Sequence, residues 1–247
     1  MEPLPIANTA FVGSQYREAM PARPTVKKDL LSGSVGKLAF PRGHRKFSLP
    51  FFWMVADLPR CDEQRIFDVS CLTEMIIHAT RKLAQRLPNV STETLTESSP
   101  LGSWHADRLT IDRRPCVLFC HDETRAALFS AGLRKPQFAA LGNDVFKPLF
   151  ADTLAGLGCP DVEIRKALLV LGRCQFDTAT DRSVLSSMRV ARQDLEAYVW
   201  RFPNVLMVDP VEASCRLSRR PASMHGGKFI RPNKLLLEMI ARLPSSG

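Results

Sequence analysis

The sequence of 247 residues contains no apolar run long enough to cross a membrane. Its most apolar stretch, residues 47–55, is interrupted by Pro50, whereas a membrane-spanning helix needs about 20 apolar residues. The first residues have neither the basic start nor the apolar segment of a secretory signal peptide. We therefore expect a protein that is not exported and that has no membrane partner.

Several standard motifs of enzymes and nucleotide-binding proteins are also missing. The sequence has no Gly-x-Gly-x-x-Gly, His-Glu-x-x-His or Gly-x-Ser-x-Gly segment. Gly226-Gly227-Lys228 resembles the end of a phosphate-binding loop. However, Ala222 stands where that loop needs its upstream glycine, and Phe229 replaces its Ser or Thr. Only two tyrosines are present, so few rings can stack on a single-stranded nucleic acid. These absences predict no cofactor.

The cysteines follow neither a disulfide nor a zinc pattern. Their number, seven, is odd, and without an export signal this indicates reduced thiols in the cytoplasm. Cys116, Cys120 and His121 are the closest local group of metal-binding residue types, but no second Cys or His pair follows at zinc-site spacing. Buried cysteine is a common small apolar side chain, so we predict a structural role and no metal site.

Acidic residues are scarce near the C-terminus. The whole chain has a formal net charge of +9, and residues 201–247 contain eight basic and only three acidic residues. Such a block attracts nucleic acid through counterion release, or an acidic protein. The alternative is a solvated basic tail. The arginines that would contact such a partner are Arg113, Arg114, Arg216, Arg219 and Arg220.

Regular hydrophobic periodicity is missing from residues 1–74, where prolines fall at irregular intervals. This is typical of a disordered extension. Residues 75–247 are predicted to form a single α+β domain whose C-terminal part is basic. Because the regular pattern begins at a methionine, Met75 is an alternative to Met1 as the true start of the protein.

Alternating and helical patterns define the elements of the predicted domain. Strands cluster before helices, which favours the α+β class, with a small, mainly antiparallel sheet packed against several helices. The clearest helix has Asp181 as its N-cap and ends before Pro203. The predicted strands are 75–79, 104–111, 116–121, 173–177 and 206–208, and the predicted helices are 80–87, 138–157, 161–171, 182–201 and 232–243. A basic loop is expected over 216–228.

Three segments, taken in order, resemble a bacterial family known only as domain of unknown function 6933. They read Met75-Ile76-Ile77-x-x-Thr80-x-Lys82-Leu83, then Trp104-x-Ala106 with Ile111-Asp112-Arg113-Arg114-x-Cys116, then Phe176-x-Thr178-x-x-x-Arg182-Ser183-Val184. The resemblance covers about residues 75–201 and extends toward the C-terminus. It implies a domain boundary and no activity.

The strongest local group of candidate site residues surrounds the start of the helix at 182. Free N–H groups and the macrodipole favour an anion there. Thr178 and Ser183 would donate hydrogen bonds to such an anion, and Arg182 would grip a phosphate or carboxylate. The alternative is an ordinary N-cap, with Arg182 paired to a neighbouring carboxylate.

Two weaker groups lie on the predicted hairpin. Arg113 and Arg114 follow Asp112 at its turn and suit phosphate contacts, although Asp also favours turns for local reasons. His105 and Asp107 share one face of a strand, so that Asp107 would orient the imidazole for acid–base chemistry. The alternative is a half-exposed hairpin face.

Two functions follow from these patterns. The first is a cytoplasmic module that binds nucleic acid or a protein through its arginines. The second is an enzyme that acts on a phosphorylated or other anionic substrate, with Asp181 and the helix start joined by His105 or Asp112. The second function requires these separated segments to converge at one site.

Overall fold

A computed structural model describes residues 73–223 and 229–244. The predicted disorder of residues 1–74 falls, except for Thr73 and Glu74, outside these described residues. None of the described helices is both long enough and apolar enough to span a membrane.

A five-stranded mixed sheet forms the centre of the described domain, in the order β4-β3-β2-β1-β5. The strands are β1 (Glu74–Ala79), β2 (Trp104–Ile111), β3 (Arg114–His121), β4 (Ala127–Ser130) and β5 (Arg173–Asp177). The hairpin β2–β3 and the pair β3–β4 are antiparallel, whereas β1 runs parallel to both β2 and β5. The α+β class is therefore confirmed. The expected antiparallel pairing is found among β2, β3 and β4. Strand β1 instead makes two parallel pairings, and hydrophobic alternation along the sequence does not predict the direction of pairing.

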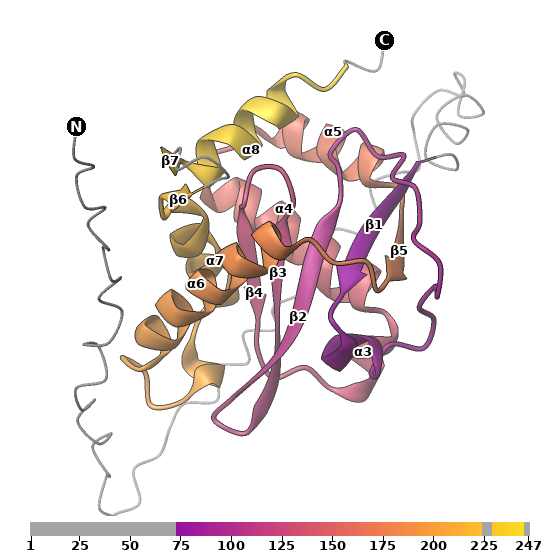
Figure 1. The fold of residues 1–247 in the computed structure, drawn as a ribbon. Coiled ribbons are helices and arrows are strands. Elements are labelled where there is room, and N and C mark those ends of the chain that lie inside the picture. The colour runs from indigo at the N-terminus through magenta and orange to yellow at the C-terminus, as the bar shows by residue number, and fades with distance from the viewer. Residues whose placement is uncertain (1–72, 224–228, 245–247) are drawn as a thin grey trace, which may run out of the picture. The chain divides into compact units, whose positions relative to one another are not determined.

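Helices cover both faces of the sheet (Figure 1). One face packs against α4 (Lys147–Gly156), α5 (Asp161–Leu171) and α8 (Pro232–Ala241) around an aromatic core. The other face packs against α6 (Arg182–Val199) and α7 (Pro210–Arg219). The apolar cluster under α6 and α7 contains residues of β2, β3 and β4 but none of β1 or β5. The polar side chains of β1 and β5 therefore have room on that face.

Several local predictions are confirmed, and others are corrected. Helices form at 161–171 and from 182, and Asp181 caps the latter by accepting hydrogen bonds from the N–H groups of Ser183 and Val184. Pro148 is expected to kink or split the helix predicted over 138–157, and this segment is divided into α3 (Lys135–Ala139), the π-helix η1 (Leu141–Phe146) and α4, which begins at Lys147. The remaining short elements are α2 (Arg81–Ala84), η2 (Val205–Met207), β6 (Ala222–Ser223) and β7 (Phe229–Ile230).

The expected strand at 206–208 is wrong, because Asn204 caps the 3-10 turn η2 through the N–H of Leu206. The expected basic loop is also wrong up to Arg219. Asp209 caps α7, and the hydroxyls of Ser214 and Ser218 accept hydrogen bonds from the N–H groups of Phe129 and Ala127. These two serines satisfy the outer edge of β4, which holds this segment helical.

The first described residues take part in the sheet. Strand β1 begins at Glu74, one residue before the predicted boundary at Met75. The N–H of Arg173 donates to the carbonyl of Thr73 at 3.1 Å. Gly172 has φ of 57°, and a Cβ there would lie 1.8 Å from that carbonyl oxygen. A chain that begins at Met75 would lack these contacts.

Candidate active site

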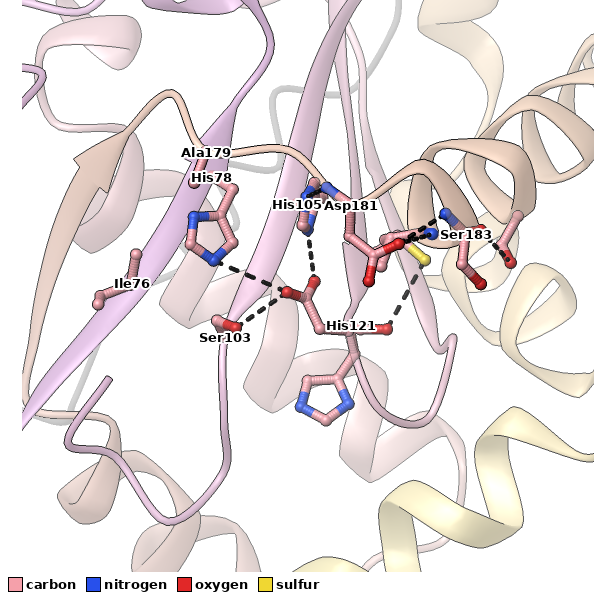
Figure 2. Close-up of polar contacts among 12 residues, drawn as sticks. Ile76, His78, Ser103, His105, His121, Ala179, Asp181 and Ser183 are labelled. Atoms are coloured by element: carbon pink, nitrogen blue, oxygen red, sulfur yellow. Dashed lines mark hydrogen bonds and ion pairs between the residues drawn. The ribbon is translucent and has the colours of Figure 1, made fainter. Parts of the chain in front are cut away.

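Three polar side chains lie side by side on the α6 face of the sheet because of the strand register. His78 on β1 is paired with Asp177 on β5 and with His105 on β2. Register partners point to the same face, so Asp177, His78 and His105 form one row across three strands. Asp122, the first residue after β3, completes this group. Figure 2 shows the two imidazoles of the group, His78 and His105. We call these four residues the His–Asp cluster.

A buried carboxylate fixes the first imidazole. Nδ1 of His78 lies 2.6 Å from Oδ1 of Asp177, whose side chain is 1% exposed. Asp177 also accepts hydrogen bonds from the N–H groups of Leu95 at 3.0 Å and Ala179 at 3.1 Å. An ionised carboxylate can only accept, so Nδ1 of His78 carries the proton that is donated to Asp177. The lone pair of the neutral ring is therefore on Nε2.

The second imidazole uses both of its nitrogens. Nδ1 of His105 donates to Oδ1 of Asp122 at 2.6 Å, while Nε2 accepts the N–H of Asp181 at 3.0 Å. A backbone N–H can only donate, so His105 is a neutral ring with its proton on Nδ1. His105 therefore joins the start of α6 to Asp122 and has no nitrogen left for a substrate.

Asp122 is held ionised by its neighbours. Burial disfavours its charge, but hydrogen bonds from His105 and from the hydroxyl of Ser103 outweigh burial, and the pKa of this carboxyl lies below its ordinary value. Its Oδ2 lies 3.8 Å from Nε2 of His78, whose side chain is 13% exposed. Nε2 of His78 therefore makes no hydrogen bond within the described residues, and carboxylates lie at both ends of the ring.

The same residues include a set of potential metal ligands. His78, His105 and Asp122 each offer one ligand atom, and these atoms lie within 4.8 Å of one another. Two histidines and one carboxylate would suit a divalent transition metal. However, coordination by His105 would break its bond with either Asp122 or the N–H of Asp181, since both of its nitrogens are occupied. The hydrogen bonds favour a proton-transfer site over a metal centre.

The structure brings together some of the sequence-predicted residues. The backbone N–H of Asp181 contacts His105, whereas the carboxylate of Asp181 caps α6. Asp107 lies on the same face as His105, but it accepts a hydrogen bond from the hydroxyl of Thr80 at 2.7 Å, and it is Asp122 that orients His105. Thr80 stands at the N-cap of α2, but its side chain makes no capping hydrogen bond.

The hairpin turn lies elsewhere. Asp112 is at the opposite end of β2 from His105, where it accepts the N–H of Val205 at 2.8 Å. Arg113 and Arg114 are exposed at the same turn. Asp112 and these arginines therefore do not join the His–Asp cluster.

The predicted anion-binding residues at the start of α6 are divided in their roles. The carboxylate of Asp181 occupies the first N–H groups of the helix, which is the ordinary N-cap. Thr178 and Arg182 are exposed, and Ser183 is half-buried. Arg182, expected to pair with a carboxylate in the N-cap alternative, has no ion pair within the described residues.

The arginines expected in a basic tail lie on or beside α7 and contact the protein itself. Arg216 lies over the ring of Tyr198, with its guanidinium carbon 5.1 Å from the ring centre. Arg219 donates to the carbonyl of Gly156, and Nε of Arg220 lies 3.0 Å from Oδ2 of Asp194. These three guanidinium groups therefore already contact groups of the protein itself, whereas the tail hypothesis expects them to contact a partner.

Sequence reasoning missed His78, Asp122 and Asp177. They come from three separated segments, and no local spacing relates them to each other or to His105. A usable signal was the position of each at or just beyond a strand end. That signal becomes a site only when β1 is known to lie between β2 and β5.

His121 is the remaining described histidine, and its ring lies against that of Trp104. Figure 2 shows this ring pointing away from those of His78 and His105. Its Nε2 donates to the carbonyl of Leu101 at 2.5 Å, and its Nδ1 accepts the N–H of Thr124 at 3.0 Å. Burial lowers the pKa of His121. The nearby thiols are buried as well, and burial raises the pKa of Cys120 to about 12, which leaves it an unreactive thiol.

The lowered pKa of His121 makes stability depend on pH. Above about pH 6.5 the ring is neutral in both states; below it, the unfolded chain binds a proton that the folded chain refuses. We expect the free energy of unfolding to fall between pH 7 and 5, by at most about 1.4 kcal/mol per pH unit from this group. The lowered pKa of Asp122 adds a further loss only below about pH 4.

Urea denaturation at pH 7.0 and 5.5 measures this effect, with His121→Gln as the comparison. The variant is less stable at pH 7.0 but should show a smaller difference between the two pH values. Equal pH differences in the two proteins would show that His121 is not the cause.

Comparison with known proteins adds a family and nothing more. The sequence model of one family, described as Domain of unknown function (DUF6933), matches residues 76–235. No curated protein and no solved structure matches the chain.

Proposed function

We propose, for a chain that belongs to the family of unknown function DUF6933, that it is an enzyme in which His78 transfers a proton to and from a small anionic substrate. The observation that carries the proposal is the pairing of Nδ1 of His78 with buried Asp177, while Nε2 makes no hydrogen bond within the described residues.

The His–Asp cluster has the parts that general acid–base catalysis needs. A carboxylate that accepts from Nδ1 fixes the tautomer and stabilises the imidazolium that forms when Nε2 takes a proton. Asp122 lies 3.8 Å from Nε2 and adds a second negative charge beside that imidazolium. His105 holds Asp122 in place and connects it to the start of α6.

In a hydrolytic reaction, His78 by itself can both accept and return the proton that is transferred. Nε2 of His78 takes a proton from a water molecule, whose oxygen bonds to the electrophilic centre of the substrate. The bond to the leaving oxygen breaks, and the imidazolium returns the proton to that oxygen. Both steps are assigned to His78. Both nitrogens of His105 and of His121, the other described histidines, already make hydrogen bonds within the protein.

The first alternative, a binding module for nucleic acid or for a protein partner, rests on charge alone. Arg216, Arg219 and Arg220 each contact a group of the protein itself. Arg113 and Arg114 lie at the far end of the hairpin from the His–Asp cluster. The enzyme is preferred because it gives a role to the carboxylate-oriented imidazole of His78, which the binding hypothesis leaves without one.

A substrate-free experiment tests the state of His78. Diethyl pyrocarbonate modifies an unprotonated imidazole nitrogen, and peptide mass spectrometry gives the rate at each histidine. We expect His78 to react at least about tenfold faster than His105 and His121, since only its nitrogen is available. Equal or slower modification of His78 in the full chain would contradict the proposed free Nε2.

Activity is then tested with p-nitrophenyl phosphate and p-nitrophenyl acetate as probes. We expect His78→Gln to lower the rate of whichever probe the full chain hydrolyses by about 10²–10⁴-fold. Asp107→Asn is the matched control, because its carboxyl lies on the same face but does not touch the cluster. If EDTA abolishes the activity and Zn²⁺ restores it, the proposal of proton transfer by His78 is wrong and the cluster is a metal centre.

A further inference from the structure

A cavity of about 650 Å³ lies beside the first two turns of α6, against β6 and β7. Among the described residues, its polar lining consists of hydroxyls and guanidinium groups and includes no Asp or Glu. Such a lining favours an oxyanion, because hydroxyls and guanidinium groups donate hydrogen bonds, although the hydroxyl of Ser187 already donates to the carbonyl of Ser183. The polar side chains of the lining are Arg182, Ser183, Ser186, Ser187, Arg220 and Ser223.

The first arginine of the cavity is uncommitted. Arg182 is exposed, and its side chain has no hydrogen bond or ion pair among the residues at 73–223 and 229–244. Arg220 contributes a second guanidinium, which Asp194 holds at 3.0 Å from outside the lining. A planar guanidinium can bind two oxygens of one phosphate, so Arg182 is the natural primary contact.

A third arginine lies behind the wall of the cavity. Arg125 is 7% exposed, and its terminal nitrogens donate to the carbonyl of Asp122 and to the hydroxyl of Ser183, the latter at 3.0 Å. Its Nε–H is buried without a partner, and it has no ion pair in the described part of the chain. A buried guanidinium without a carboxylate is unfavourable unless an anion compensates it. Its bond to Ser183 places this guanidinium behind a hydroxyl that lines the cavity.

We propose that this cavity binds the phosphate group of the substrate, an inference that rests on the proposed function. The volume is within the usual range for small-molecule sites. The cavity is also joined to the His–Asp cluster, because Asp181, next to Arg182, donates its N–H to His105, and Arg125 contacts both Ser183 and Asp122. No residue of the His–Asp cluster lines the cavity, so a substrate whose phosphate is held by Arg182 would have to extend out of the cavity to reach His78.

The side chains, and not the helix end, supply the donors. The carboxylate of Asp181 already occupies the N–H groups of Ser183 and Val184, as Figure 2 shows. The helix N-terminus is therefore neutralised by its own cap. Binding depends instead on the guanidinium of Arg182 and on the hydroxyl of Ser183, with Arg125 behind it.

Calorimetric titration of the full chain with inorganic phosphate tests the proposal. We expect Arg182→Gln and Ser183→Ala each to raise the Kd for phosphate, by about tenfold for the arginine because its charge-assisted hydrogen bonds are lost. Arg189→Gln is the matched control: it removes the same charge from an exposed site on α6 that does not line the cavity. Phosphate binding should be unchanged in this control.

Two further measurements are needed. One separates phosphate binding in the cavity from proton transfer by His78, and the other distinguishes a small phosphorylated substrate from the phosphates of a nucleic acid. His78→Gln should bind phosphate as the unaltered chain does, so a loss of hydrolysis with intact phosphate binding separates proton transfer from anchoring. A single-stranded DNA oligonucleotide is the second probe. The cavity proposal fails if the full chain does not bind phosphate at millimolar concentration. It also fails if Arg182→Gln and Arg189→Gln weaken phosphate and DNA binding equally.

Discussion

Asp177→Asn is expected to remove proton transfer by His78 almost completely, by about 10³–10⁴-fold in kcat, while the chain still folds. The asparagine amide would donate to Nδ1 of His78 wherever its NH₂ replaces the acceptor oxygen, and the ring proton would then move to Nε2. His78 would become a donor on its exposed side and lose its function as a base. Nitrogen-15 shifts of the His78 ring report this tautomer directly.

The same substitution has a measurable structural cost. Asp177 accepts three hydrogen bonds, from His78, Leu95 and Ala179, and asparagine cannot satisfy all three. One unsatisfied buried donor costs about 1–3 kcal/mol, so the folded fraction must be checked before kcat is compared. An Asp177→Asn variant that keeps the Nδ1–H tautomer and full hydrolysis would show that His78 does not depend on Asp177.

Phe146→Ala should destabilise the domain by about 3–5 kcal/mol. Phe146 is 0% exposed, and its ring lies 5.0 Å from that of Trp104, 5.2 Å from that of Phe119 and 5.8 Å from that of Phe150. Truncation removes ring contacts with three partners and leaves a cavity that the rigid sheet closes poorly. Urea denaturation at neutral pH measures the loss.

Phe202→Ala is the control for this core prediction. Phe202 is half-buried and contacts one aromatic ring, that of Tyr198, so its loss should be clearly smaller than that of Phe146. Similar losses in the two variants would mean that the aromatic cluster around Phe146 is not the tightly packed centre of the domain. Because Trp104 precedes His105, Phe146→Ala also tests how strongly this core supports the His–Asp cluster.

Local patterns predicted α5, α6 and α8 well because the information they need is local. The apolar residues at spacings of three and four, and an Asp that can reach two N–H groups, both lie within one segment, as α6 and its cap Asp181 show. The segment at 206–208 failed for a related reason. Its three apolar residues fit a strand, but capping by Asn204 directs them into a turn.

The site was predictable only in part. His105 and Asp181 were each identified from their own segments, and their contact follows from the loop that carries Asp181 across β2 to the start of α6 (Figure 1). Asp107 was the wrong partner for His105, since alternation fixes the face of a side chain but not its neighbour across strands. Asp122 follows β3 and contacts His105, and Asp177 on β5 contacts His78. These two pairings cannot be predicted from the spacing of the residues along the chain.

The sequence by itself determined the α+β class, the main helices, the β2–β3 hairpin and the resemblance to a family that the match over residues 76–235 confirms. These features depend on periodicity, caps and order along the chain. The tertiary structure alone decided that β1 lies between β2 and β5, which sets His78 between Asp177 and His105. It also placed the buried Arg125 against Ser183. The physical reason is that strand pairing and buried charge depend on contacts between distant segments, which composition and spacing do not record.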